Sequence, residues 1–205
     1  MKRSMKFNHL LPMFLHLFLF SSCFTFGQTI ESPPTRVPVL DMDGDPVHKN
    51  RLYYILSVNG TVDEGGLRYI SYKYCKYQII QEKLGTPNGH FWVFSNLADH
   101  TTIDLSNDIS IGVGNLYTVC SKEPVWIVEQ NGYVDGDVSY GHNADDTKFK
   151  IEKDDKGDGY RIVHCGNSNG CKNVGVVIEK NGRRRIALTE SPLVVKFKKF
   201  GDFSS

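Results

Sequence analysis

The stretch from Phe149 to Phe200 constrains the fold of this 205-residue chain most, because it reads almost entirely as strand and turn. Phe149 and Ile151 alternate with charged residues, which is the two-residue period of a half-buried strand. Asn181-Gly182 predicts a hairpin with a type I′ turn, since that turn needs positive φ at both central residues. Five strands in about fifty residues leave no room for a helix and indicate antiparallel β-structure.

The remainder of the chain continues this pattern. Strands are expected around 39–40, 52–56, 67–70, 74–81, 91–94, 109–113, 116–120 and 126–129. Apolar residues nowhere keep a 3.6-residue period for three turns, so almost no helix is expected, and 135–146 is predicted as a surface loop. No clean internal repeat is visible. These patterns alone predict an all-β barrel or sandwich.

The strand register predicts which side chains are buried. The predicted core consists of Tyr54, Leu56, Ile79, Trp92, Trp126, Phe149, Ile151, Ile162, Val177, Ile186, Val195 and Phe197.

The N-terminal segment is predicted to be a secretory signal peptide over residues 1–27. Three basic residues precede the apolar run Leu10 to Phe20, and Thr25 and Gly27 are small residues suited to cleavage before Gln28. The apolar run is too short for a membrane anchor, so no membrane association is expected after cleavage. The proline-rich segment 28–38 is expected to be an extended lead-in, and 39–205 a single domain.

Charge and cysteine content narrow the class of protein. Cleavage at this position leaves 21 basic and 23 acidic residues, a formal charge of −2, which argues against nucleic-acid binding. The basic runs 183–185 and 196–199 are interpreted as solvated strand faces. Cys23 leaves with the signal, and the four remaining cysteines of a secreted chain predict two disulfides, with three possible connectivities. Asn59 begins a glycosylation sequon in a polar turn.

Several motifs imitate catalytic or metal sites. The segment 166–170 matches G-x-S-x-G around Ser168, but no helix fits between Cys165 and Cys171, as a nucleophile elbow would require. Asp41 begins an EF-hand-like run, yet Pro46 stands where that loop requires glycine. The histidines lack metal-ligand spacing. No enzymatic activity, metal or cofactor is therefore predicted.

Two long motifs at opposite ends of the chain resemble plant Kunitz-type (soybean-trypsin-inhibitor-like) proteins. The first comprises VLDMDGDP at 39–46, YYIL at 53–56 and GGL at 65–67; the second runs from FKIEK at 149 through YRIVHC to PLVVKFKK at 192–199. The resemblance implies a monomeric β-trefoil of about twelve antiparallel strands with pseudo-threefold symmetry. It also implies the disulfides Cys75–Cys120 and Cys165–Cys171.

The resemblance assigns a candidate inhibitory loop to SNLADHTT at 95–102, after the G-x-x-V-x-F strand. Its predicted reactive residues are Ser95, Asn96, Leu97, Ala98, Asp99 and His100. Such a loop enters a protease cleft as a substrate-like segment, and its P1 side chain fills the S1 pocket. The spacing places P1 at Leu97 or Ala98.

Two departures from the family pattern affect this loop. It has no central Arg or Lys for the acidic S1 pocket of trypsin, and Asp99 lies at or beside P1′. Asp45 occupies the turn where the family tends to place a loop-supporting Asn, and a carboxylate cannot donate hydrogen bonds.

These observations predict a secreted inhibitor of a serine or papain-like cysteine endopeptidase, of the kind that serves plant defence. The expected location is the apoplast, with the vacuole as the alternative. Trypsin inhibition is doubtful because the loop lacks a basic centre. The alternative function is a non-inhibitory binding or storage protein on the same fold; chlorophyll binding is disfavoured because Lys76, and no proline-rich segment, follows Cys75.

Overall fold

The computed structural model describes residues 36–58, 65–83, 88–96, 100–114, 120, 122–138, 144–157, 159–166 and 170–201. Within them it contains twelve strands and a single 3₁₀ turn, η1 (Ala144–Thr147). The strands are β1 (Leu52–Ser57), β2 (Leu67–Lys73), β3 (Lys76–Gln81), β4 (Phe91–Asn96), β5 (Ile109–Val113), β6 (Val125–Val128), β7 (Val134–Asp137), β8 (Phe149–Lys153), β9 (Tyr160–His164), β10 (Lys172–Ile178), β11 (Arg184–Thr189) and β12 (Val194–Lys199). The predicted signal peptide, the predicted glycosylation site Asn59, residues 116–119 of the strand predicted at 116–120, and Ser168 lie outside the described residues.

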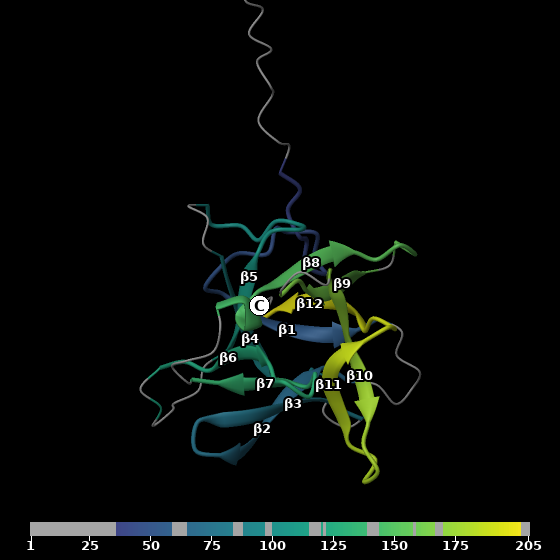
Figure 1. Cartoon of the computed structure of the whole chain (residues 1–205). Coiled ribbons are helices and arrows are strands. Elements are labelled where there is room, and N and C mark those ends of the chain that lie inside the picture. The colour runs from purple at the N-terminus through teal and green to yellow at the C-terminus, as the bar shows by residue number, and fades with distance from the viewer. Residues whose placement is uncertain are drawn as a thin grey trace, which may run out of the picture. The chain divides into compact units, whose positions relative to one another are not determined.

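Six of the strands close into an antiparallel ring. β1 pairs with β4 and β12, β4 with β5, β5 with β8, β8 with β9, and β9 with β12. The other six form the hairpins β2–β3, β6–β7 and β10–β11, and β3 also pairs with β7 and β11. These hairpins lie together below the ring in Figure 1. Each group of four consecutive strands thus gives two strands to the ring and one hairpin, which is the β-trefoil arrangement.

A repeated turn sequence supports this threefold pattern. Glu129-Gln130-Asn131-Gly132-Tyr133 joins β6 to β7, and Glu179-Lys180-Asn181-Gly182-Arg183 joins β10 to β11. In both turns the Glu N–H donates to the carbonyl four residues later, and the Asn side chain accepts the N–H two residues later. Only the glycine of each pair has positive φ, 82° in both. The predicted hairpin at 181–182 is therefore correct, but its turn is a three-residue loop ending in a left-handed glycine and not type I′.

An aromatic core fills the ring. Trp92 packs edge-on against Trp126 with ring centroids 5.2 Å apart, and Trp126 packs similarly against Phe149 at 5.7 Å. Most predicted core positions are buried, but Tyr54, Leu56 and Val177 are only half-buried, so the predicted register of β1 was wrong.

In β1 it is Tyr53 and Ile55 that are fully buried. Tyr53 can lie inside because its hydroxyl accepts a hydrogen bond from the N–H of His48 at 3.0 Å. Tyr54 instead packs against Phe91 and Phe200 on the outer side of these strands, with ring centroids 4.9 and 6.1 Å away.

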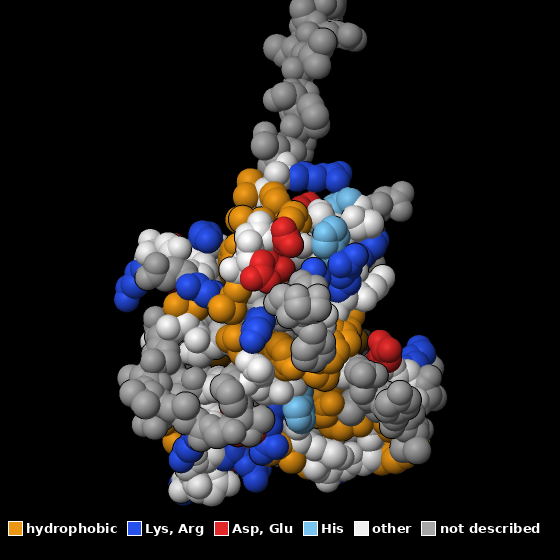
Figure 2. Space-filling view, turned by 180° about the vertical axis from the view of Figure 1, so that it is seen from behind, with side chains coloured by type: hydrophobic (Ala, Val, Ile, Leu, Met, Phe, Trp, Pro, Cys, Tyr) orange, Lys and Arg blue, Asp and Glu red, His pale blue; other side chains and the backbone are white. Residues whose placement is uncertain are grey.

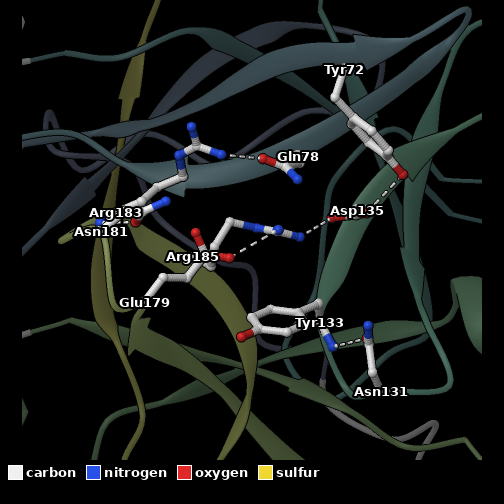
Figure 3. A network of polar contacts seen from close by, with 9 residues as sticks. All are labelled: Tyr72, Gln78, Asn131, Tyr133, Asp135, Glu179, Asn181, Arg183 and Arg185. Atoms are coloured by element: carbon white, nitrogen blue, oxygen red, sulfur yellow. Dashed lines mark hydrogen bonds and ion pairs between the residues drawn. The ribbon is translucent and has the colours of Figure 1, made fainter.

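The basic run 183–185 was predicted to form a solvated strand face, and for Arg185 this prediction was wrong. Arg185 is 5% exposed, and its Nη2 lies 2.5 Å from Oδ1 of Asp135, which is 6% exposed (Figure 3). The Tyr72 hydroxyl donates to Oδ2 of Asp135 at 3.1 Å, and the Arg185 guanidinium lies over the ring of Tyr133. Asp135 belongs to the buried strand β7, so the surface loop predicted for 135–146 was wrong over its first three residues.

Two disulfides fasten surface connections to the sheet. Cys75 is bonded to Cys120 and Cys165 to Cys171, the pairs that the resemblance implies. Figure 2 shows basic side chains in several separate groups on one face, with hydrophobic side chains across its middle. In the described part of the chain no helix is long and apolar enough to span a membrane, and no group of three potential metal ligands occurs.

Candidate functional site

The predicted inhibitory loop begins at the end of β4. Ser95 and Asn96 are the last residues of this strand and pair with Ser110 and Ile109 of β5, so they belong to the sheet that carries the loop. Leu97, Ala98 and Asp99 lie outside the described residues. The assignment of P1 to Leu97 or Ala98 therefore stays a prediction, and the structure describes the two arms on either side.

A side-chain hydrogen bond joins the two arms at their base. Nδ2 of Asn96 donates to the carbonyl oxygen of Thr102 at 2.9 Å. The bond connects residues six positions apart and leaves five residues between its ends. An amide side chain is suited to this role because it can donate to a backbone carbonyl that has no sheet partner of its own.

A neighbouring segment supports both arms through its backbone. The N–H of Asn50 donates to the carbonyl of Phe94 at 2.9 Å, and the N–H of Lys49 donates to the carbonyl of Thr101 at 2.8 Å. Asn50 has φ of 61°, a conformation that asparagine tolerates better than most side chains. The residues from Lys49 to Asn50 thus contact the loop before its centre and after it.

The second arm is anchored in the core. Ile103 is fully buried, its N–H donates to the carbonyl of Val47 and its own carbonyl accepts from the N–H of Val39, both at 2.8 Å. Because a buried isoleucine cannot leave its site without losing apolar burial, this arm has a fixed end.

On the second arm, the side chains of His100 and Asp104 approach each other. Nε2 of His100 lies 2.8 Å from Oδ2 of Asp104, within ion-pair distance, and neither atom makes a hydrogen bond within the described residues. The Thr102 hydroxyl lies 3.3 Å from the other carboxylate oxygen of Asp104. Asp104 is only 3% exposed, so its carboxyl group lies in the protein interior.

Asp45, the predicted loop support, lies in an exposed turn. Its N–H donates to Oδ1 of Asp41 at 3.0 Å, and its carbonyl accepts from the N–H of Asp41. These bonds stabilise the turn 41–45 itself. Among the described residues, backbone contacts to the arms come from Val47, Lys49 and Asn50, whereas the support of the loop by Asp45 stays a prediction.

The comparisons with known proteins agree on one family. The family model described as trypsin and protease inhibitor (Kunitz, legume type) matches residues 39–199. Kunitz trypsin inhibitor 4 of Arabidopsis thaliana is 31% identical over 179 residues, covering 78% of this chain and 81% of the relative. Aspartic protease inhibitor 5 of Solanum tuberosum is 28% identical over 220 residues, covering 89% of this chain and 93% of the relative.

Solved structures agree with the sequence relatives. The bifunctional α-amylase/subtilisin inhibitor of Oryza sativa superposes with a TM-score of 0.66 at 26% identity, covering 80% of this chain and 99% of that one. The match of the family model over most of the chain, the ring with three hairpins and the two disulfides lead to one conclusion: the chain belongs to the Kunitz family of trypsin and protease inhibitors.

Proposed function

We propose that this protein inhibits an endopeptidase by inserting the loop around residues 95–102 into the active-site cleft. The supporting observation is that both arms of the loop are held before and after its centre, by the Asn96–Thr102 hydrogen bond and by the backbone of Lys49 and Asn50. A loop held in this way loses little conformational entropy on binding, which favours tight association.

The homologues are protease inhibitors and not enzymes, and the protein is accordingly not an enzyme. Their named targets include trypsin and aspartic proteases, so the family alone does not select a target. The loop sequence is the better guide to specificity.

The chemistry of the loop centre favours a protease with an apolar S1 pocket. Leu97 or Ala98 at P1 offers an uncharged side chain. An acidic S1 pocket would have to bury its carboxylate without a cationic partner, whereas an apolar pocket carries no such cost. Asp99 next to this position and Asp45 in the first turn are expected to weaken binding. We therefore propose a chymotrypsin-like or elastase-like serine protease as the target, with a papain-like cysteine protease as the second candidate.

The test is an inhibition panel with the purified chain starting at Gln28, assayed against trypsin, chymotrypsin, elastase, papain and an aspartic protease. We expect measurable inhibition of chymotrypsin or elastase and none of trypsin. Absence of inhibition across the panel, together with cleavage between residues 96 and 100, would favour the alternative that this member of the family is a binding or storage protein.

The proposal includes the route of the protein out of the cell. We propose that residues 1–27 are removed as a signal peptide, that the remainder acts as a secreted monomer in the apoplast, and that Asn59 carries a glycan. Mass spectrometry of protein purified from apoplastic fluid tests the cleavage point and the glycan together; recovery from vacuoles instead would redirect the location.

A further inference from the structure

We propose that His100 and Asp104 form a positioning pair that fixes the second arm of the loop and protects the bonds between residues 96 and 100 from hydrolysis. This inference rests on the proposed function for its consequence in inhibition. Its structural part, the restraint of the arm, stands apart from whether any protease is inhibited.

Asp104 lies in the buried part of the second arm. It follows the buried Ile103, pairs as an isolated β-bridge with Pro38, and is 3% exposed. It therefore belongs to the rigid part of the arm. A buried carboxylate is costly unless polar or cationic groups contact it, so the contacts of His100 and Thr102 with Asp104 are favoured over solvent exposure of those side chains.

The imidazole of His100 lies against the Asp104 carboxylate. The side chain of His100 is 17% exposed and places Nε2 2.8 Å from Oδ2 of Asp104, four residues along the chain. Thr102, between them, contacts Oδ1 through its hydroxyl. The Asp104 carboxylate thus contacts the side chains of His100 and Thr102, which both lie nearer to the loop centre.

In the described part of the second arm, the other contacts nearest to the loop centre act at Thr101 and Thr102 and not at His100. The Asn96 amide and the backbone of Lys49 restrain the second arm at Thr102 and Thr101. The His100–Asp104 contact acts one residue closer to the loop centre. It connects His100 to Asp104, which lies beside the buried Ile103. A rigid segment at this place keeps the newly formed chain end near the cleft after cleavage, which favours religation over release.

A double-mutant cycle tests the pair. The variants are His100→Gln, Asp104→Asn and the double variant, which change side-chain volume little. The first readout is the second-order rate constant for hydrolysis between residues 96 and 100 by chymotrypsin, with the cleaved bond identified by mass spectrometry. The inhibition constant for the same protease and the midpoint of thermal unfolding are measured in parallel.

Each single variant is expected to be hydrolysed in the loop on the order of tenfold faster than the unsubstituted protein, and the double variant no faster than the singles. Equal rates for all four proteins, or a double variant whose rate is the product of the two single effects, would overturn the pair. His100 is close to the surface, so His100→Gln remains informative even if Asp104→Asn lowers the folding yield.

A matched cycle supplies the control. In the β8–β9 region Arg161 pairs with Asp155 at 3.1 Å and with Glu152 at 2.9 Å; Asp155→Asn removes the first ion pair and Arg161→Gln removes both. These variants are expected to leave hydrolysis of the loop unchanged; an equal increase would attribute the effect to general loss of charge pairs and refute the proposal. If the unsubstituted protein inhibits nothing but the loop cycle shows coupling, the proposed function fails and the pair stands.

Discussion

Arg185 and Asp135 meet in the interior although they lie 50 residues apart, with Nη2 2.5 Å from Oδ1. The pair links β11 to β7, so it joins two of the three hairpins beside the ring. Asp135 is also contacted by Tyr72 of β2, from the third hairpin. One buried carboxylate thus receives contacts from both other hairpins, as Figure 3 shows.

Removal of Arg185 should destabilise the fold strongly. Arg185→Leu leaves Asp135 buried without its cation, which we expect to lower the free energy of unfolding by about 3 kcal/mol. Urea denaturation measures this. Arg183→Leu, at an exposed neighbour that contacts Gln78, is the matched control and should change stability by less than about 1 kcal/mol. Equal effects would show that the burial of the Arg185–Asp135 pair is irrelevant to stability.

The two disulfides should differ in what they contribute. Cys75–Cys120 closes a span of 45 residues and Cys165–Cys171 a span of 6. Because a cross-link restricts the unfolded chain more when it closes a longer loop, we expect Cys75→Ser/Cys120→Ser to cost about 4 kcal/mol and Cys165→Ser/Cys171→Ser about 2 kcal/mol. Denaturation of the two double variants checks the order; a larger loss from the shorter loop would contradict the chain-entropy account.

His90 should make stability fall as the pH falls. Burial lowers the pKa of His90, and nearby Arg68 acts in the same direction. Nδ1 also accepts a hydrogen bond from the N–H of Tyr69 at 3.4 Å, so a proton there would remove an acceptor. The unfolded chain therefore binds the proton more readily, and the folded state loses stability as the pH falls through about 6.5 toward the lower folded-state pKa.

The variant that isolates this effect is His90→Asn, which keeps an acceptor but does not titrate. Thermal unfolding midpoints measured from pH 8 to pH 5 should fall less steeply for His90→Asn than for the unsubstituted protein. The comparison at pH 8, where both side chains are neutral, serves as the reference. Parallel pH profiles would show that His90 does not contribute.

A basic residue at P1 should convert the protein into a trypsin inhibitor. Leu97→Arg and Ala98→Arg, made separately, each place a guanidinium where the acidic S1 pocket can receive it, and one of them should inhibit trypsin measurably. The variant at the non-P1 position is the internal control. If neither inhibits and both are cleaved as ordinary substrates, the loop lacks the preorganised inhibitory shape.

Local sequence patterns predicted much of the fold. Alternating apolar residues located most strands, and Asn181-Gly182 located the β10–β11 hairpin. The turn type was wrong because Asn-Gly pairs also suit a three-residue loop in which only the glycine has positive φ. The repeat of Glu-x-Asn-Gly at 129 and 179 spans only four residues, so it indicates a structural repeat only together with the strand pairing.

The errors in burial have a common physical origin. Tyr53 and Tyr54 are adjacent, and a two-residue period cannot say which of them faces inward. The choice depends on the His48 N–H, which satisfies the Tyr53 hydroxyl inside the core. Arg185 was misjudged for a similar reason, since its partner Asp135 lies in a segment too polar to be recognised as a buried strand.

The resemblance predicts the candidate loop at 95–102, but it does not predict which residues support its arms. Lys49 and Asn50 act through backbone N–H groups, which carry no side-chain signature in a sequence. The residue type of Asn50 is the one signal in the sequence, because asparagine favours turns and tolerates the positive φ of 61° that it has in the structure.

The way the arms are held separates recognition from folding. The contacts that fix them are made by the neighbouring segment 47–50 and by residues 94, 96 and 100–104 of the arms themselves. None of these contacts uses a side chain of residues 97–99. Residues 97–99 can therefore vary independently of the contacts that hold the arms. A few substitutions there could change the protease target in evolution while the rest of the domain stays the same.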